Sequence, residues 1–137
     1  MNIIADPKAS NASRMPARSG GAALRIAMVT TFYPPYNFGG DGIYVQRLAR
    51  ALVARGHHVE VIHDTDGYRA LAGEPGSARA ADDGITVHRL GSRMPKLSSL
   101  AVQQFGTPCM HAARLRELLT DRFDVIHFHN ISLVGGP

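Results

Sequence analysis

The sequence has little that would cross-link the chain or anchor it in a membrane. It contains one cysteine, Cys109, which excludes an internal disulfide bond, and it contains no tryptophan. No apolar run approaches the roughly 20 residues that a membrane-spanning helix needs. Lys and Arg exceed Asp and Glu only modestly, 15 against 11, and are scattered, which argues against nucleic acid as a partner. A packed domain of ordinary size remains, with the cytoplasm as the expected compartment.

The amino-terminal segment differs in composition from the rest of the chain. Residues 1–23 combine Ser, Asn, Pro, Gly and three basic residues without hydrophobic periodicity. Such a segment buries too little apolar surface to order itself, and it lacks the apolar core of a secretory signal. We therefore expect a disordered tail over residues 1–23 and a folded domain over residues 24–137.

The first half of this domain has the pattern of a parallel β-α-β unit. Residues 26–29 form a short apolar run typical of a buried strand, and residues 59–62 form another. Between them lie a loop rich in Gly and Pro and a stretch, residues 45–53, with its apolar positions on one helical stripe. Gly56 follows that stretch, where a helix commonly ends in a left-handed residue.

The second half continues the alternation of strands and helices. We expect a long loop over residues 64–84 with one helical turn near residues 68–72. Further elements are expected as strands at residues 85–90 and 124–129 and as helices at residues 97–105 and 108–119. This order predicts an α/β fold, a Rossmann-like parallel sheet with flanking helices. Four strands leave an unpaired edge and uncovered apolar faces, so we expect the domain to be incomplete.

Three polar features are predicted to meet where the strands end, the usual ligand-binding edge of an open α/β sheet. They are the loop at residues 30–42, Asp64, and the pair His129 and Asn130. Gly39 and Gly40 precede a helix, where free backbone N–H groups favour a phosphate or diphosphate. A flexible turn is the plain alternative. We expect Asp41 to cap the helix, because its carboxylate would repel a phosphate.

A nicotinamide-dinucleotide site is a further alternative. Gly40, Gly42 and Val45 give G-x-G-x-x-V, and Asp64 follows at the distance of a ribose-binding acid. Val45 replaces the third glycine, however, and the loop before Gly40 is longer than a tight β-α turn. An NAD-dependent oxidoreductase is therefore the weaker hypothesis.

The histidines of the last predicted strand are candidates for chemistry. His127 and His129 lie two residues apart, so their imidazoles point to the same face of the sheet. No third metal ligand follows at a credible spacing, and we predict no metal site. We expect His127 to be packed within the sheet and His129 to lie at its mouth, where it can contact a substrate or carry a proton. The other histidines, including His111 on the buried stripe of the last helix, are expected to be structural.

Basic residues gather on the predicted first helix. Arg47 and Arg50 lie on its polar face and Arg55 follows its end. A solvated surface explains them most simply, and peripheral contact with an anionic membrane is the alternative.

Two motifs in this order resemble a known enzyme group. The first runs R-I-A-M-V-T-T-F-Y-P-P, then G-G, then L-A-R-A-L-V-A-R-G-H-H-V-E-V, and the second is D-V-I-H-F-H-N. Together they resemble the amino-terminal part of retaining GT-B glycosyltransferases, the group related to glycogen and sucrose synthases. The resemblance covers residues 25–130 and implies two facing Rossmann-like domains, of which the amino-terminal one mainly binds the acceptor.

The resemblance also implies roles for individual residues. Gly39 and Gly40 would lie against the diphosphate or the transferred sugar of a nucleotide-sugar donor, and His129 would approach that sugar as the catalytic residue. The acceptor, a sugar, a lipid or another hydroxyl compound, would meet a set of residues comprising Pro35, Tyr36, Asn37, Phe38 and Asn130. Transfer in this group retains the anomeric configuration and needs no metal or further cofactor.

One departure from the group concerns the second domain. The basic residues and paired glutamates that would hold the nucleotide-sugar are absent from this sequence. We therefore expect a truncated acceptor-side domain that depends on a missing carboxyl-terminal domain and is inactive alone. A stand-alone nucleotide- or sugar-binding module is the alternative from another class.

Overall fold

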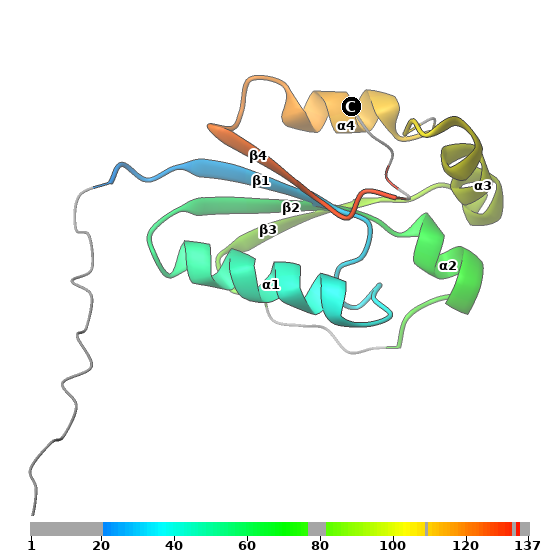
Figure 1. Cartoon of the computed structure of the whole chain (residues 1–137), viewed down its shortest axis with the longest axis horizontal. Coiled ribbons are helices and arrows are strands. Elements are labelled where there is room, and N and C mark those ends of the chain that lie inside the picture. The colour runs from blue at the N-terminus through cyan, green and yellow to red at the C-terminus, as the bar shows by residue number, and fades with distance from the viewer. Residues whose placement is uncertain (1–20, 77–81, 109, 133, 135–137) are drawn as a thin grey trace, which may run out of the picture.

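The computed structural model describes residues 21–76, 82–108, 110–132 and 134. Four parallel strands form one sheet in the order β3-β2-β1-β4 (Figure 1). The strands are β1 (Arg25–Thr30), β2 (His58–Asp64), β3 (Ile85–Leu90) and β4 (Val125–His129). The helices are α1 (Gly40–Val53), α2 (Asp66–Ala72), α3 (Pro95–Phe105) and α4 (Ala112–Leu119). The predicted α/β fold with a Rossmann-like parallel sheet is confirmed.

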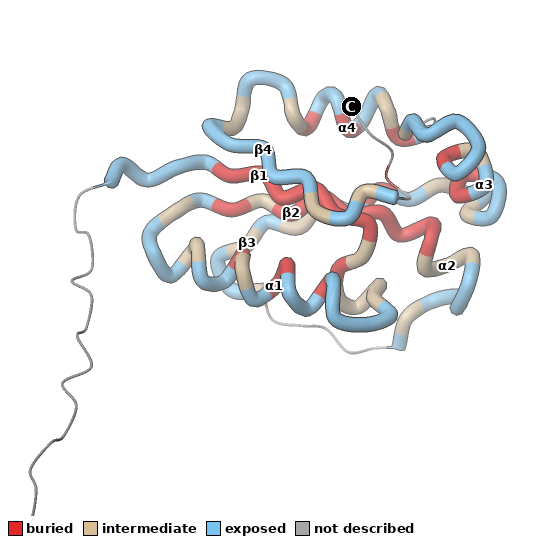
Figure 2. The backbone as a smooth tube through the Cα atoms, viewed as in Figure 1, coloured by how far each residue is buried: buried red, intermediate tan, exposed pale blue. Residues whose placement is uncertain are grey.

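The central strands are buried because helices cover both faces of the sheet. α1 lies on one face and α4 on the other, and Figure 2 shows the burial concentrated between them. On the α1 side, Ile26 and Met28 of β1 pack with Val45 and Ala49. On the α4 side the core cluster consists of Val29, Ile62, Leu90, Leu115, Leu118 and Val134. Alternate residues of β1 thus enter two different cores, as the period of a strand requires.

α1 forms as its periodicity predicts. Its buried residues include Val45, Gln46 and Ala49, and Arg47 and Arg50 are exposed on the opposite side. The chain then turns through Gly56, whose φ of 87° lies in the left-handed region that favours glycine. The predicted β-α-β unit is therefore confirmed.

The segment after β2 departs from the prediction of a long loop. α2 begins at Asp66, directly after β2, instead of as a single turn further along. Asp64, Thr65 and Asp66 are all buried, which is unusual for polar residues unless they are hydrogen-bonded. The polar residues that suggested a loop, Asp64 to Asp66, are instead part of a buried hydrogen-bonded network.

β4 forms one edge of the sheet, and its side chains are accessible. Val125, Ile126, His127 and Phe128 are exposed. The prediction that His127 is packed within the sheet is therefore wrong, because within the described residues β4 pairs with β1 alone and forms an edge of the sheet. Beside Phe128 lies a largely apolar hollow of about 490 Å³, also lined by Leu115 and Leu119 of α4.

The amino-terminal expectation lies mostly outside the described residues. Residues 21–23 are exposed and have no regular secondary structure, and β1 begins at Arg25, close to the predicted domain boundary. Within the described part of the chain, each helix is too short or too polar to span a lipid bilayer.

Candidate functional site

The loop between β1 and α1 is a compact structure held by its own backbone. A cis peptide bond joins Pro34 and Pro35, and the N–H of Tyr33 donates to the carbonyl of Tyr36 at 3.1 Å. Asn37 then donates from Nδ2 to the carbonyl oxygen of Gly39 at 2.6 Å. These contacts fix the position at which α1 starts, beside the carboxyl end of β1.

The carboxyl end of β4 is tied to the same place. The N–H of Thr31 donates to the carbonyl of Asn130 at 2.8 Å, which extends the β1–β4 pairing past the strands. Asn130 has a φ of 37°, in the left-handed region that Asn tolerates better than most residues. Its side-chain Nδ2 donates to Oδ2 of Asp41, in the first turn of α1, at 2.6 Å. The start of α1 and the end of β4 are therefore joined.

This hydrogen bond corrects the prediction for Asp41. No side chain caps α1, whose N-cap residue is Gly39. The Asp41 carboxylate instead holds the loop that follows β4.

His129 is oriented by an aromatic neighbour on α1. The rings of Tyr44 and His129 are stacked, with centroids 5.3 Å apart and an interplanar angle of 24°. His127 meets His129 edge-on at 6.1 Å, so the two imidazoles share a face as predicted. The predicted glycine pair and His129 thus belong to one region, at the carboxyl end of the sheet.

The glycines of this region differ in the space beside their Cα atoms. A Cβ at Gly39 or Gly40 would meet no atom within 4 Å. At Gly42 it would lie 2.5 Å from Oδ1 of Asn37 and 3.0 Å from the carbonyl oxygen of Phe32. Packing therefore explains Gly42, whereas the space beside Gly39 and Gly40 is open to a ligand.

An aromatic cluster extends the region toward α2. Phe38, half exposed, stacks on Tyr68 with a centroid distance of 4.6 Å, and Tyr36 meets Tyr68 edge-on at 5.8 Å. Tyr36 and Phe38 are two of the predicted acceptor residues, and the cluster brings them together. Tyr68 was missed by the sequence analysis, because nothing in the expected loop distinguished it.

His63 lies beneath this cluster and is fully buried between Tyr33 and Tyr36. Its Nδ1 donates to the carbonyl of Asp64 at 3.1 Å, and its Nε2 has no hydrogen-bond partner among the described residues. Burial lowers the pKa of His63 from 6.5 to about 4 despite that hydrogen bond, and Arg89 acts in the same direction as burial. The imidazole is therefore neutral at physiological pH.

The sequence analysis also missed a buried cluster of three ionisable side chains. Asp64, Asp66 and His111 bring potential ligand atoms within 4.8 Å of one another, which is a geometry open to a divalent cation. Protein groups already satisfy these atoms: Nε2 of His111 lies 3.1 Å from Asp66 and 3.5 Å from Asp64. The N–H of Gly67 also donates to Asp64 at 2.6 Å. An imidazolium supplies the positive charge that two buried carboxylates need.

The pKa shifts within this group agree with an ion pair. The hydrogen bond to Asp64 raises the pKa of His111 above its ordinary value, against the opposing effect of burial. Burial would raise the pKa of Asp66, but hydrogen bonds from Ser92 and Ser98 and the charge of His111 outweigh it and lower the pKa. Asp64 is thereby occupied within the protein and is not free to bind a ribose, which disfavours the dinucleotide alternative.

Comparison with known proteins connects this fold and its glycine-histidine region to a family. The model of the glycosyl transferase 4-like domain matches residues 39–137. The chain belongs to this glycosyltransferase family. It is also similar to an uncharacterized glycosyltransferase of Methanocaldococcus jannaschii (MJ1607), with 32% identity over 115 residues, or 78% of this chain. This chain spans 25% of that relative's length.

The glycosyltransferase family match begins at Gly39 and includes His129, so the proposed donor-side residues lie within it, whereas residues 35–38 lie just before it. The fold and the joining of α1 to β4 agree with the predicted glycosyltransferase domain. The roles of Gly39, Gly40 and His129 in donor binding, and of residues 35–38 and Asn130 in acceptor binding, stay predictions.

Proposed function

We propose that this chain is the acceptor-side domain of a retaining GT-B glycosyltransferase that uses a nucleotide-sugar donor. One observation carries the proposal: the Asn130–Asp41 hydrogen bond joins the end of β4 to the start of α1, beside the open space at Gly39 and Gly40. The fold and the family match support it.

In the proposed site, the open backbone at Gly39 and Gly40 receives the donor diphosphate or the transferred sugar. The N–H groups at the start of α1 stabilise the negative charge of the leaving group. His129 donates a hydrogen bond to a hydroxyl of the transferred sugar, and Tyr44 holds the imidazole in place by stacking.

The proposed transfer reaction needs no metal ion. The bond between the anomeric carbon and the diphosphate oxygen breaks, and its electron pair leaves with the nucleoside diphosphate. The acceptor hydroxyl oxygen bonds to the same carbon, and the hydroxyl proton passes to the diphosphate. Tyr36 and Phe38 line the acceptor side, where aromatic rings suit the apolar face of a sugar or the chain of a lipid.

We further propose that residues outside this chain complete the site. The exposed apolar side chains of β4 and the hollow beside Phe128 support a domain that is covered by additional structure. A second domain would supply the cations for the diphosphate and the contacts for the nucleotide.

A turnover assay tests the proposal. The purified chain is incubated with labelled UDP-glucose, GDP-mannose and ADP-glucose and a panel of hydroxyl acceptors, and no transfer above background is expected. In the complete transferase that carries this domain, His129→Ala is expected to lower turnover by about tenfold or more. Transfer by the chain alone, or an unchanged rate in the His129 variant, would contradict the proposal.

A further inference from the structure

α3 turns two serines and one valine toward the protein and exposes two leucines to solvent. Its buried residues are Ser98, Ser99 and Val102. Leu97 and Leu100 are 52% and 58% exposed. Surface helices of globular proteins normally show the reverse arrangement, with the apolar stripe against the core. The outward side of α3 therefore carries two leucines that no packing among the described residues explains, beside the exposed polar residues Lys96, Gln103 and Gln104.

The inward serines are only partly explained by neighbours. Ser98 Oγ lies 3.4 Å from Nε2 of the buried His111, so it belongs to the ion-pair network at the end of β2. Ser99 Oγ is buried without a hydrogen-bond partner among the described residues. This network fixes which side of α3 faces inward, and the leucines are thereby directed outward.

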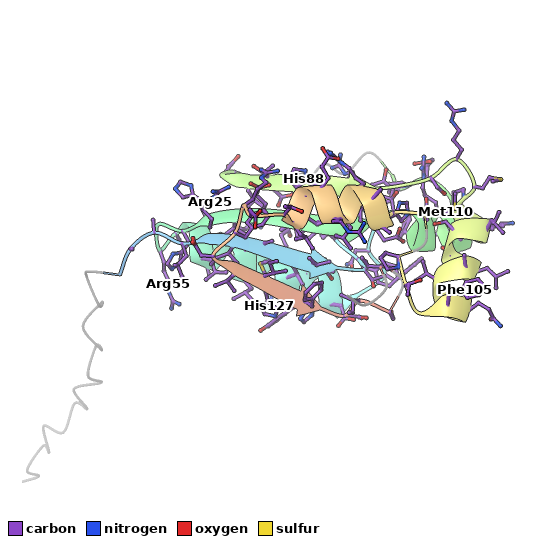
Figure 3. All side chains as sticks on the ribbon, turned by 90° about the horizontal axis from the view of Figure 1, so that it is seen from above. Arg25, Arg55, His88, Phe105, Met110 and His127 are labelled. Carbon is purple, nitrogen blue, oxygen red and sulfur yellow. The ribbon has the colours of Figure 1, made fainter. Side chains whose placement is uncertain are left out.

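The apolar surface continues beyond α3. Leu71 of α2, which packs against α3, is 75% exposed, and Phe105 at the end of α3 is 70% exposed. Figure 3 shows Phe105 at the tip of the molecule, with its ring pointing away from the sheet. We call this surface the α3 face and define it by Leu71, Met94, Leu97, Leu100 and Phe105 together with Arg93 and Lys96.

Basic residues lie within the α3 face. Lys96 lines a hollow of about 310 Å³ with Leu71 and Leu100, and another of about 400 Å³ with Met94 and Leu97. Arg93 is exposed one turn earlier in the chain. The centres of protein–protein interfaces are depleted of lysine, whereas a lipid surface takes apolar side chains beside Lys and Arg.

We propose that the α3 face is a docking surface for an anionic phospholipid bilayer. Leucine and phenylalanine side chains enter the boundary between headgroups and acyl chains, and Lys96 and Arg93 contact the phosphates. α1 carries exposed arginines but does not offer the same surface, because Arg50 is held by Asp82. We therefore assign the proposed membrane contact to the α3 face and not to the basic helix α1.

The position of the α3 face relates it to the candidate site. α2 follows the carboxyl end of β2 and α3 follows that of β3, at the end of the sheet where α1 begins (Figure 1). Docking through the α3 face brings that end of the domain to the bilayer. The proposal does not depend on transferase activity, because vesicle binding is measured without substrate.

Vesicle co-sedimentation of the full chain tests the proposal. We expect binding to vesicles of phosphatidylcholine mixed with phosphatidylglycerol and much weaker binding to phosphatidylcholine alone. Lys96→Ser should weaken binding about fivefold, the effect of one basic residue at an anionic surface. Leu97→Ser combined with Leu100→Ser should weaken it at least about tenfold. Arg47→Ser on α1 and Leu24→Ser near β1 are matched controls and should change binding by less than about twofold.

A fluorescence measurement gives an independent readout. The chain has no tryptophan, so Phe105→Trp introduces a sole indole on the α3 face, and Leu24→Trp introduces one elsewhere. Anionic vesicles should shift the emission of the Phe105→Trp chain to shorter wavelength and leave the Leu24→Trp chain unchanged. Absence of this shift, or equal loss of vesicle binding in the Arg47 control, would overturn the proposal. A dimer in solution that Leu100→Ser abolishes would also overturn it, by assigning the face to a second copy of the chain.

Discussion

Gly40 and Gly42 lie two residues apart in the first turn of α1, and replacing each by alanine should have opposite effects. A methyl group at Gly40 would meet no atom of the chain, and alanine gains up to about 1 kcal/mol of helix propensity over glycine. We expect Gly40→Ala to leave the free energy of unfolding unchanged or to raise it by less than about 1 kcal/mol. In the complete transferase, the methyl group would enter the space proposed for the donor and lower turnover at least about tenfold.

Gly42→Ala is the matched variant in which packing decides. The added Cβ would lie 2.5 Å from Asn37 Oδ1 and 3.0 Å from the backbone carbonyl of Phe32. Asn37 would have to move, which also endangers its hydrogen bond to Gly39. Overpacking costs about 1–3 kcal/mol and helix propensity returns at most about 1 kcal/mol, so the free energy of unfolding should fall, by as much as about 2 kcal/mol.

Chemical denaturation followed by far-ultraviolet circular dichroism measures the free energy of unfolding of both variants of the chain. Turnover of the complete transferase tests the proposed ligand contact at Gly40. A Gly40 variant that is destabilised by more than about 1 kcal/mol, or that retains full turnover, would refute the assignment of that position to a ligand. A Gly42 variant as stable as the unmodified chain would refute the packing reason for that glycine.

Three further outcomes are expected. The neutral, buried His63 should make the chain lose about 3 kcal/mol of stability as the pH falls from 6.5 to about 4, because the unfolded chain binds the proton first. His63→Phe should remove this pH dependence in denaturation measured across that range. A variant with the same slope of stability against pH would contradict the role of His63. Tyr44→Leu should move the imidazole proton resonances of His129 in NMR spectra, because the stacked aromatic ring is lost, whereas Tyr44→Phe should preserve them; identical resonances in both variants would remove the positioning role. The exposed edge strand β4 should make the chain self-associate in sedimentation, and Ile126→Lys should reduce that association; association that the variant leaves unchanged would show that β4 is not the contact.

The alternation of elements was predictable because strands and helices have different hydrophobic periods. Residues 26–29, 45–53 and 59–62 gave clear patterns, and the structure forms elements there. The convergence of Gly39 and His129 on one region could also be predicted, because parallel strands end at the same edge.

The environment of β4 could not be read from its own residues. An apolar run such as Val125 to Phe128 has the same pattern whether its strand is central or at an edge. The strand order reveals that, in the part of the chain that the structure describes, β4 pairs with β1 alone, and this order exposes His127.

Long-range pairing explains the features that the sequence analysis missed. Asp66 and His111 are 45 residues apart, and no local rule relates them. The inward position of Ser98 on α3 follows from that network, because Ser98 meets His111. The periodicity of residues 97–105 predicted a helix, but the side that faces the protein depends on those distant partners.

The most direct measurement is an NMR titration of the ¹⁵N-labelled complete transferase that carries this domain with UDP-glucose, GDP-mannose and ADP-glucose. The proposed site predicts that one of these donors shifts the amide signals of Gly39 and Gly40 together with the imidazole signals of His129. Uridine, guanosine and adenosine, which lack the diphosphate and the sugar it carries, should not produce these shifts. Donor-induced shifts confined to other parts of the chain, or none for any donor, would contradict a sugar-diphosphate site formed by the start of α1 and the end of β4.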